Sequence, residues 1–227
     1  MRINKLLSNY GYCSRKEVNR LIEDNRIKVN GNICEKGQWV EESDDIFLDD
    51  NKVKPKEKIY IVLNKPPGII CTASKEIENN IISYLNYSEY VFPVGRLDKD
   101  SQGLILMTND GETANKILSS DSYHEKEYVV TLDKDFDDNF IEKMSLGVEI
   151  LGGVTRPCKV KRIDGNVFRI ILTQGLNRQI RRMSKALGYN VIKLERIRII
   201  NIEIQGLALG EWRIINKEKI NELIEQI

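Results

Sequence analysis

The sequence predicts an α+β protein with two parts: a small N-terminal domain, and a larger domain built on a mixed, largely antiparallel sheet. Short apolar runs typical of strands are interspersed with helical segments and tight hairpin signals, without the regular alternation of strand and crossover helix. A lysine-rich stretch divides the chain near residue 50. At 227 residues the chain has room for one small and one medium-sized domain.

The small domain is expected over residues 1–48. Ser14 and Glu17 form a capping box that opens a helix, and the apolar residues at 18, 21 and 22 give this helix one buried face. The cations Arg15, Lys16 and Arg20 lie off that face and point to solvent. Residues 26–33 then alternate around Asn30-Gly31, which is the strongest short hairpin signal.

A linker is expected over residues 49–58, where lysines and a proline make a poor core element. The larger domain follows over residues 59–227. Its expected strands cover residues 59–63, 90–94, 104–108 and 128–132, and a further hairpin turns at Asp164-Gly165. Its expected helices lie near residues 112–119, 137–145, 177–187 and 217–226.

The net charge of +1 conceals an uneven distribution. Residues 156–213 contain 13 Lys or Arg against four acidic residues, whereas residues 114–155 contain nine acidic residues against four lysines. A local positive field attracts a polyanion such as RNA more effectively than the net charge indicates. The alternative is a solvated basic surface without a partner.

Several function classes are disfavoured by what the sequence lacks. The four cysteines are scattered and form no Cys-x-x-Cys pair, and His124 is the only histidine. We therefore expect no metal, no disulfide framework and a reducing, cytoplasmic location. No apolar run is long enough for a membrane span, and no phosphate-binding or dinucleotide fingerprint is present, so we expect no membrane association and no cofactor.

The loop at residues 95–104 is the most informative candidate site. It places Asp98 between two apolar runs, with Arg96 and Lys99 on either side. An aspartate in such a loop is usually a turn former, but Asp100 fits that role better. The flanking cations favour an ionised carboxylate, which suits a nucleophile and not a general acid.

A second candidate site is the basic segment at residues 174–183. Asn177 is expected to cap a helix whose core face includes Ile180 and Met183 and which ends at Gly188. Arg178, Arg181, Arg182 and Lys185 lie on its other faces. Cations in the first turn oppose the helix dipole, so they are better suited to bind an external anion than to stabilise the helix.

These motifs resemble those of the RNA pseudouridine synthases, in the branch that comprises synthase A for small-subunit ribosomal RNA and synthases B, E and F for large-subunit ribosomal RNA. The resemblance rests on Arg96-Leu97-Asp98, on Lys126-Glu127-Tyr128 and on the segment from Arg178 to Arg182, and it runs in order from about residue 2 to residue 216. The helix and hairpin of the N-terminal part resemble the S4 RNA-binding domain.

The resemblance implies a role for each matched residue. Asp98 would be the nucleophile, Arg181 would pair with it through a bidentate guanidinium, and Tyr128 would stack on the target base and take part in a later proton transfer. The residues expected to contact RNA in the larger domain are Arg96, Leu97, Lys99, Arg178, Gln179, Ile180, Arg182 and Lys185. In the S4-like domain they are Arg15, Lys16, Arg20, Arg26 and Lys28.

The expected function is therefore the isomerisation of specific uridines to pseudouridine in 23S ribosomal RNA, with a tRNA open as a second substrate, by a monomer without cofactors. Two alternatives stay open from the residues alone. One is a non-catalytic S4-type RNA-binding or ribosome-assembly factor, for which Asp98 would be dispensable. The other is a nucleic-acid glycosidase that uses Asp98 with Asp100 and releases free uracil.

Overall fold

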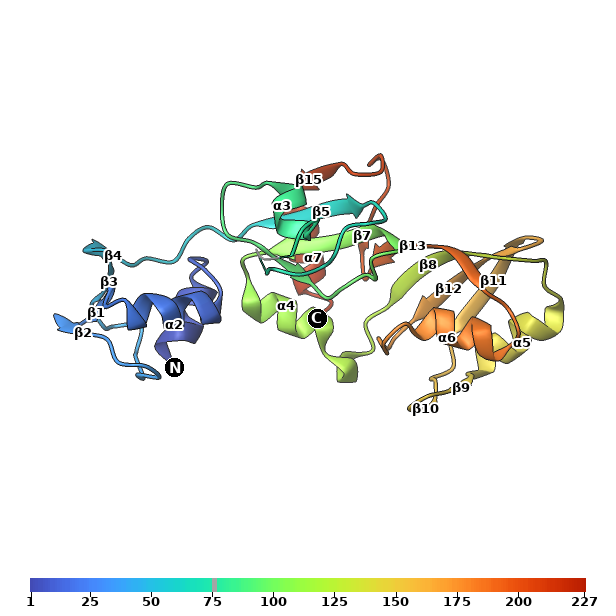
Figure 1. Ribbon diagram of the computed structural model, residues 1–227, viewed down its shortest axis with the longest axis horizontal. Helices are drawn as coiled ribbons and strands as arrows, with labels where there is room; N and C mark the ends of the chain where they lie inside the picture. The colour runs from blue at the N-terminus through green and yellow to red at the C-terminus, as the bar shows by residue number, and fades with distance from the viewer. Residues whose placement is uncertain (75–76) are drawn as a thin grey trace.

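The N-terminal unit lies at one end of an elongated molecule, in a computed structural model that describes residues 1–74 and 77–227 (Figure 1). Its elements are α1 (Ile3–Asn9), α2 (Arg15–Glu23), β1 (Ile27–Val29), β2 (Asn32–Ile33), β3 (Ile46–Leu48) and β4 (Asn51–Lys52). The buried faces of α1 and α2 pack on β1 and β3 and form a small apolar core.

Local sequence signals account for the two main features of this unit. The Ser14 side chain caps α2 by accepting a hydrogen bond from the Glu17 backbone N–H at 3.2 Å. Asn30 and Gly31 both have positive φ angles, +50° and +82°, as the tight turn between β1 and β2 requires. The predicted capped helix and hairpin are confirmed.

The N-terminal unit extends beyond residue 48. Asp49 and Asp50 adopt positive φ angles and turn the chain into β4, which pairs with β3, and Val53 is buried in the apolar core. Only residues 54–58 of the expected linker form an extended connection. The two aspartates make this turn possible because Asp tolerates the left-handed region better than most residues.

A mixed sheet forms the framework of the remaining chain, and within the described residues it has nine strands. Its strand order is β11-β12-β8-β13-β7-β5-β15, with β14 beside β13 and β6 beside β7. All pairs are antiparallel except β13 with β7. The strands are β5 (Tyr60–Lys65), β6 (Phe92–Val94), β7 (Gln102–Thr108), β8 (Lys126–Leu132), β11 (Lys159–Asp164), β12 (Val167–Leu172), β13 (Val191–Ile199), β14 (Ile202–Glu203) and β15 (Trp212–Ile214). The predicted α+β class with a mixed sheet is confirmed.

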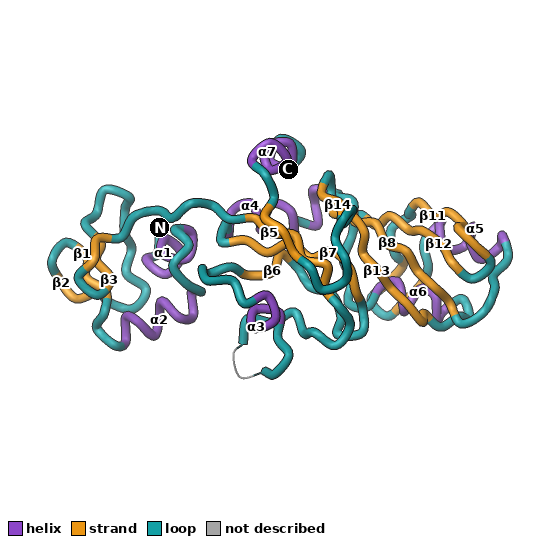
Figure 2. The backbone as a smooth tube through the Cα atoms, turned by 90° about the horizontal axis from the view of Figure 1, so that it is seen from above, coloured by secondary structure: helices purple, strands orange, loops and turns teal. Residues whose placement is uncertain are grey.

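Helices cover the two halves of this sheet differently. They are α3 (Ile81–Leu85), α4 (Gly111–Leu118), α5 (Asp138–Leu146), α6 (Gln179–Ala186) and α7 (Lys217–Ile224), with a 3-10 turn at Ser120–Ser122. On the β5–β7 half, α3 packs on one face and α4 and α7 on the other, as Figure 2 shows. On the β8–β12 half, α5 and α6 pack on the same face. A small hairpin of β9 (Glu149–Ile150) and β10 (Gly153–Val154) follows α5. None of the helices in the described ranges is long and apolar enough to cross a membrane.

The two halves of the sheet meet at one short parallel pairing. Gln102 pairs with Glu195, and Gly103 pairs with Arg196. Gly103 has a φ angle of +105°, and a Cβ atom on it would lie 2.3 Å from the Arg196 carbonyl oxygen. Glycine is therefore required where β7 and β13 approach each other. We call this contact the β7–β13 seam.

Candidate active site

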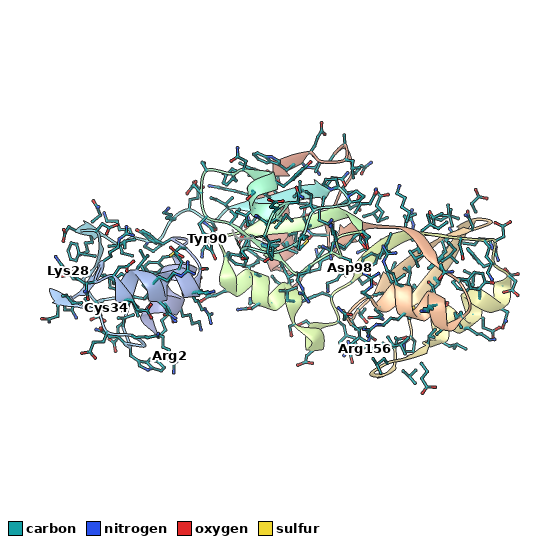
Figure 3. The ribbon with its side chains drawn as sticks, in the orientation of Figure 1. Arg2, Lys28, Cys34, Tyr90, Asp98 and Arg156 are labelled. Atoms are coloured by element: carbon teal, nitrogen blue, oxygen red, sulfur yellow. The ribbon has the colours of Figure 1, made fainter. Side chains whose placement is uncertain are left out.

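Asp98 lies in the loop between β6 and β7, and its side chain is partly exposed. The loop is anchored on both sides. Leu97 is buried in the apolar core, and its backbone N–H donates to Cys71 Sγ at 3.4 Å. The Ser101 N–H donates to the Asp98 carbonyl oxygen at 3.1 Å. Figure 3 shows Asp98 in the part of the molecule away from the N-terminal unit. The Asp98 side chain is thus presented by a fixed backbone.

A buried lysine also contacts the backbone of this loop. Lys65 is fully buried at the end of β5, and its Nζ donates to the carbonyl oxygens of Pro66 and Ile69 at 2.9 and 3.0 Å. A longer contact of 3.5 Å reaches the Lys99 carbonyl oxygen. Burial lowers the pKa of Lys65. The sequence analysis assigned no role to Lys65. A lysine at the end of a largely apolar strand was the signal that could have indicated a buried, hydrogen-bonded side chain.

Two arginines of the α6 region approach the same oxygen of Asp98. Arg178 Nη1 lies 3.5 Å from Asp98 Oδ2, and Arg181 Nε lies 3.9 Å from it. The expected pairing of Arg181 with Asp98 is present as an ion pair through one nitrogen, but the expected bidentate geometry is wrong. The terminal nitrogens of Arg181 donate instead to the Val191 carbonyl oxygen at 3.0 Å and to Ser101 Oγ at 3.2 Å. Burial and the neighbouring Arg178 charge lower the pKa of Arg181.

Arg178 occupies an unusual position at the start of α6. It is the residue before the helix and has a left-handed backbone, with φ +50° and ψ +35°. The expected capping of the helix by Asn177 is wrong, because Asn177 Oδ1 accepts a hydrogen bond from Arg182 Nη2 at 3.0 Å. The predicted core face and the end of the helix before Gly188 are confirmed. A left-handed backbone conformation costs free energy at an arginine, and residues in such conformations are found mainly at functional sites.

Tyr128 and Arg178 line the same cleft as Asp98. Tyr128 is on β8, where it pairs with Ile170 of β12 and Arg196 of β13. The cleft has a volume of about 90 Å³. Predicted site residues that line it are Arg96, Leu97, Asp98, Tyr128, Arg178, Gln179 and Ile180. The cleft is also lined by Ser101, Gln174, Gly175 and Leu176, which lie within the two candidate segments but had no role assigned, and by Leu172 and Leu194. Membership of those segments was the available signal for the first four.

The other predicted RNA-contacting residues lie outside this cleft. Lys99, Arg182 and Lys185 come from the elements that form the cleft but do not line it. The five cations of the N-terminal unit are remote from it, as Lys28 and Asp98 show in Figure 3. Three of them have carboxylate partners: Arg26 pairs with Asp49, Lys28 with Asp50 and Arg20 with Glu17. Arg15 and Lys16 are exposed at the start of α2.

Comparison with known proteins identifies both parts of the chain. Residues 59–186 match the family model described as RNA pseudouridylate synthase, and residues 1–46 match the S4 domain. The dual-specificity RNA pseudouridine synthase RluF of Escherichia coli (strain K12) is 47% identical over 230 residues, which cover 100% of this chain and 79% of that protein. Ribosomal large subunit pseudouridine synthase B of Bacillus subtilis (strain 168) is 32% identical over 231 residues, covering 98% of this chain and 95% of that protein.

A solved structure gives the same result. A crystal structure of a pseudouridylate synthase is 28% identical, covers 98% of this chain and 99% of that chain, and superimposes with a TM-score of 0.71. The resemblance to the branch that includes synthases B and F, expected from the motifs, is confirmed by the relatives. The chain belongs to the RNA pseudouridine synthase family and is an isomerase.

Proposed function

We propose that this enzyme converts specific uridines of large-subunit (23S) ribosomal RNA to pseudouridine, with Asp98 as the nucleophile. The observation that carries the proposal is the position of Asp98: a partly exposed carboxylate at the wall of a cleft, with two guanidinium groups within 4 Å of one oxygen. Relatives whose names refer to dual specificity or to the large ribosomal subunit support the choice of RNA.

The reaction rearranges bonds within one nucleotide. The bond between the sugar and N1 of uracil breaks, the base rotates, and a bond between the sugar and C5 forms, while C5 loses a proton and N1 gains one. No electron is gained or lost. Asp98 supplies the negatively charged oxygen, and Arg178 and Arg181 place positive charge beside it.

The uridine must leave its stack to reach this carboxylate. Tyr128 supplies an aromatic surface inside the cleft on which the base is expected to lie. Arg96 is exposed at the same cleft, where it can occupy the space that the base leaves in the RNA. Asp98, Tyr128 and both arginines come from one chain, which supports action as a monomer. Because ribosomal RNA is the proposed substrate, we expect the enzyme to act in the cytoplasm.

The test uses unmodified transcripts of large-subunit ribosomal RNA and, separately, of total tRNA species. Each is incubated with the protein, treated with carbodiimide and mapped by primer extension. We expect discrete new stops at specific uridines of the ribosomal RNA, and none with Asp98→Asn. Release of free uracil would instead identify a glycosidase, and binding without any new stop would identify a non-catalytic RNA-binding factor.

A further inference from the structure

Tyr123 is an exposed aromatic residue in a strained conformation. It follows the 3-10 turn after α4 and precedes β8, and 59% of its surface is exposed. Its φ angle is +52°, in the left-handed region that bulky residues rarely adopt. Conformations of this kind persist where the surrounding structure enforces them, and they gather at ligand-binding sites.

The guanidinium of Arg156 holds this ring in place. It lies over the Tyr123 ring, 4.2 Å from the ring centroid. Arg156 is itself fixed, because its backbone N–H donates to Gln174 Oε1 at 2.5 Å and its Nη1 donates to the Thr173 carbonyl oxygen at 3.3 Å. Ring and guanidinium therefore form a rigid stacked pair, which we call the Tyr123–Arg156 platform.

The platform adjoins the catalytic cleft. Gln174, which holds Arg156, lines the cleft together with Asp98. The strand that begins shortly after Tyr123 carries Tyr128 into the same cleft. Figure 3 shows Arg156 and Asp98 in the same catalytic part of the molecule. An exposed ring held, through Arg156, by a cleft-lining residue is therefore accessible to RNA that is bound at the cleft.

A nucleobase is the ligand that this surface suits. Every base has a flat π-face, and unstacked bases in RNA commonly lie on aromatic rings and on arginine planes. When the target uridine leaves its stack, its neighbours lose one stacking partner. We propose that the Tyr123–Arg156 platform stacks an unpaired nucleobase that neighbours the target uridine and so holds the RNA in register with Asp98. This inference rests on the proposed function.

The test measures binding by the full chain to the shortest large-subunit ribosomal RNA stem-loop that the wild-type protein binds. Copies of this RNA carry an abasic site at each position near the target in turn. Tyr123→Asn is the informative variant, because asparagine accepts the left-handed backbone and removes only the ring. We expect it to weaken binding to the intact RNA roughly 5- to 100-fold. Tyr123→Phe should bind like the wild type.

The decisive measurement is whether the losses in binding caused by Tyr123→Asn and by an abasic site in the RNA are additive. One abasic position should weaken wild-type binding but leave Tyr123→Asn unaffected, so that the two losses are not additive. Tyr84→Asn, which alters an exposed tyrosine on α3, is the matched control and should change nothing. Unchanged binding by Tyr123→Asn, or additive losses at every abasic position, would overturn the platform. Absence of pseudouridine in RNA that the wild type binds would overturn the proposed function and not the platform.

Discussion

Arg178 lies closer to Asp98 than Arg181 does, with 3.5 Å from Arg178 Nη1 to Asp98 Oδ2 against 3.9 Å from Arg181 Nε to the same oxygen. The two cations differ in how they are held. Arg181 is 14% exposed and bridges Ser101 to β13, whereas Arg178 is 45% exposed. Arg181 is therefore suited to hold the catalytic loop in place, and Arg178 to supply a more accessible charge at the rim.

Replacement of these two arginines should separate those roles. Arg181→Ala should lower the single-turnover rate at saturating enzyme by orders of magnitude, because it removes both a charge and the link from Ser101 to β13. Arg178→Asn keeps the left-handed backbone and removes only an exposed ion pair, so the rate should fall within about tenfold. Equal losses in rate at both positions, or losses in affinity alone, would contradict this division.

Asp98→Asn should abolish pseudouridine formation while RNA affinity and the unfolding midpoint stay close to wild type. Amide and carboxylate have nearly the same shape, so the change removes the nucleophile and little else. Single-turnover assays and filter binding measure the two properties separately. Turnover within tenfold of wild type would remove Asp98 from the nucleophilic role.

Salt dependence of RNA binding should distinguish the cations of the N-terminal unit. Arg15→Ala and Lys16→Ala should each reduce the slope of log Kd against log salt by about one, as expected for a lost phosphate contact. Arg26→Ala should leave the slope nearly unchanged, because both oxygens of Asp49 already bind the Arg26 guanidinium. Titrations over a range of KCl concentrations measure this. A full slope change for Arg26→Ala would show that RNA displaces Asp49.

Gly103→Ala should destabilise the catalytic part strongly, by more than about 3 kcal/mol, because the new Cβ meets the β13 backbone at a positive φ angle. Gly175→Ala is the control for stability, since a Cβ there meets nothing within 4 Å. Urea unfolding of the two variants gives the comparison. Similar unfolding midpoints for the two variants would mean that the backbone at the β7–β13 seam shifts readily enough to accommodate the added Cβ atom.

Lowering the pH should remove the contribution that ionised Asp110, the N-cap of α4, makes to the free energy of unfolding. Burial acts to raise its pKa, but hydrogen bonds from Tyr60 and Thr113 outweigh burial and leave the pKa lowered. The ionised form is thus favoured in the folded state, so the contribution is complete above the usual carboxyl pKa of about 3.9 and is lost as the pH falls through the lower folded value. Asp110→Ala should cost about 1 kcal/mol at pH 7, because it removes the cap of α4. This difference should shrink at pH 3 in urea unfolding, and a constant difference would contradict the assignment.

Three helices of the catalytic part were predictable because each carries a local signal, whereas the short helix α3 was not predicted. Those expected near residues 112–119, 137–145 and 217–226 are confirmed as α4, α5 and α7, and each is capped by a side chain, from Asp110, Asp137 and Asn216 respectively. Strand β13 was not predicted. Apolar residues alternate with charged ones along this strand. Arg196 is buried in it, and its Nε donates a hydrogen bond to the Leu104 carbonyl oxygen at 2.7 Å. Only the distant partner strand makes that burial favourable.

The candidate site was predictable in its residues but not in its geometry. The motifs indicated Asp98, Tyr128, Arg178 and Arg181, and these residues do come together. The contact of Arg181 with Ser101 and the left-handed backbone of Arg178 depend on how the two halves of the sheet meet. No local pattern contains that information, since it arises from pairing between segments far apart in the chain.

The β7–β13 seam also bears on how the enzyme acquires activity during folding. It pairs residues more than 90 positions apart, and it unites the half that carries Asp98 with the half that carries Tyr128 and both arginines. Closing so long a loop costs entropy before the contact repays it, so such pairings tend to form late. The buried residues of one apolar cluster come from the β8–β12 half and those of another from the β5–β7 half, so each half is expected to gain secondary structure before the two join. During refolding, catalytic competence should therefore appear after most of the circular dichroism signal has returned, in the same step in which the two halves join.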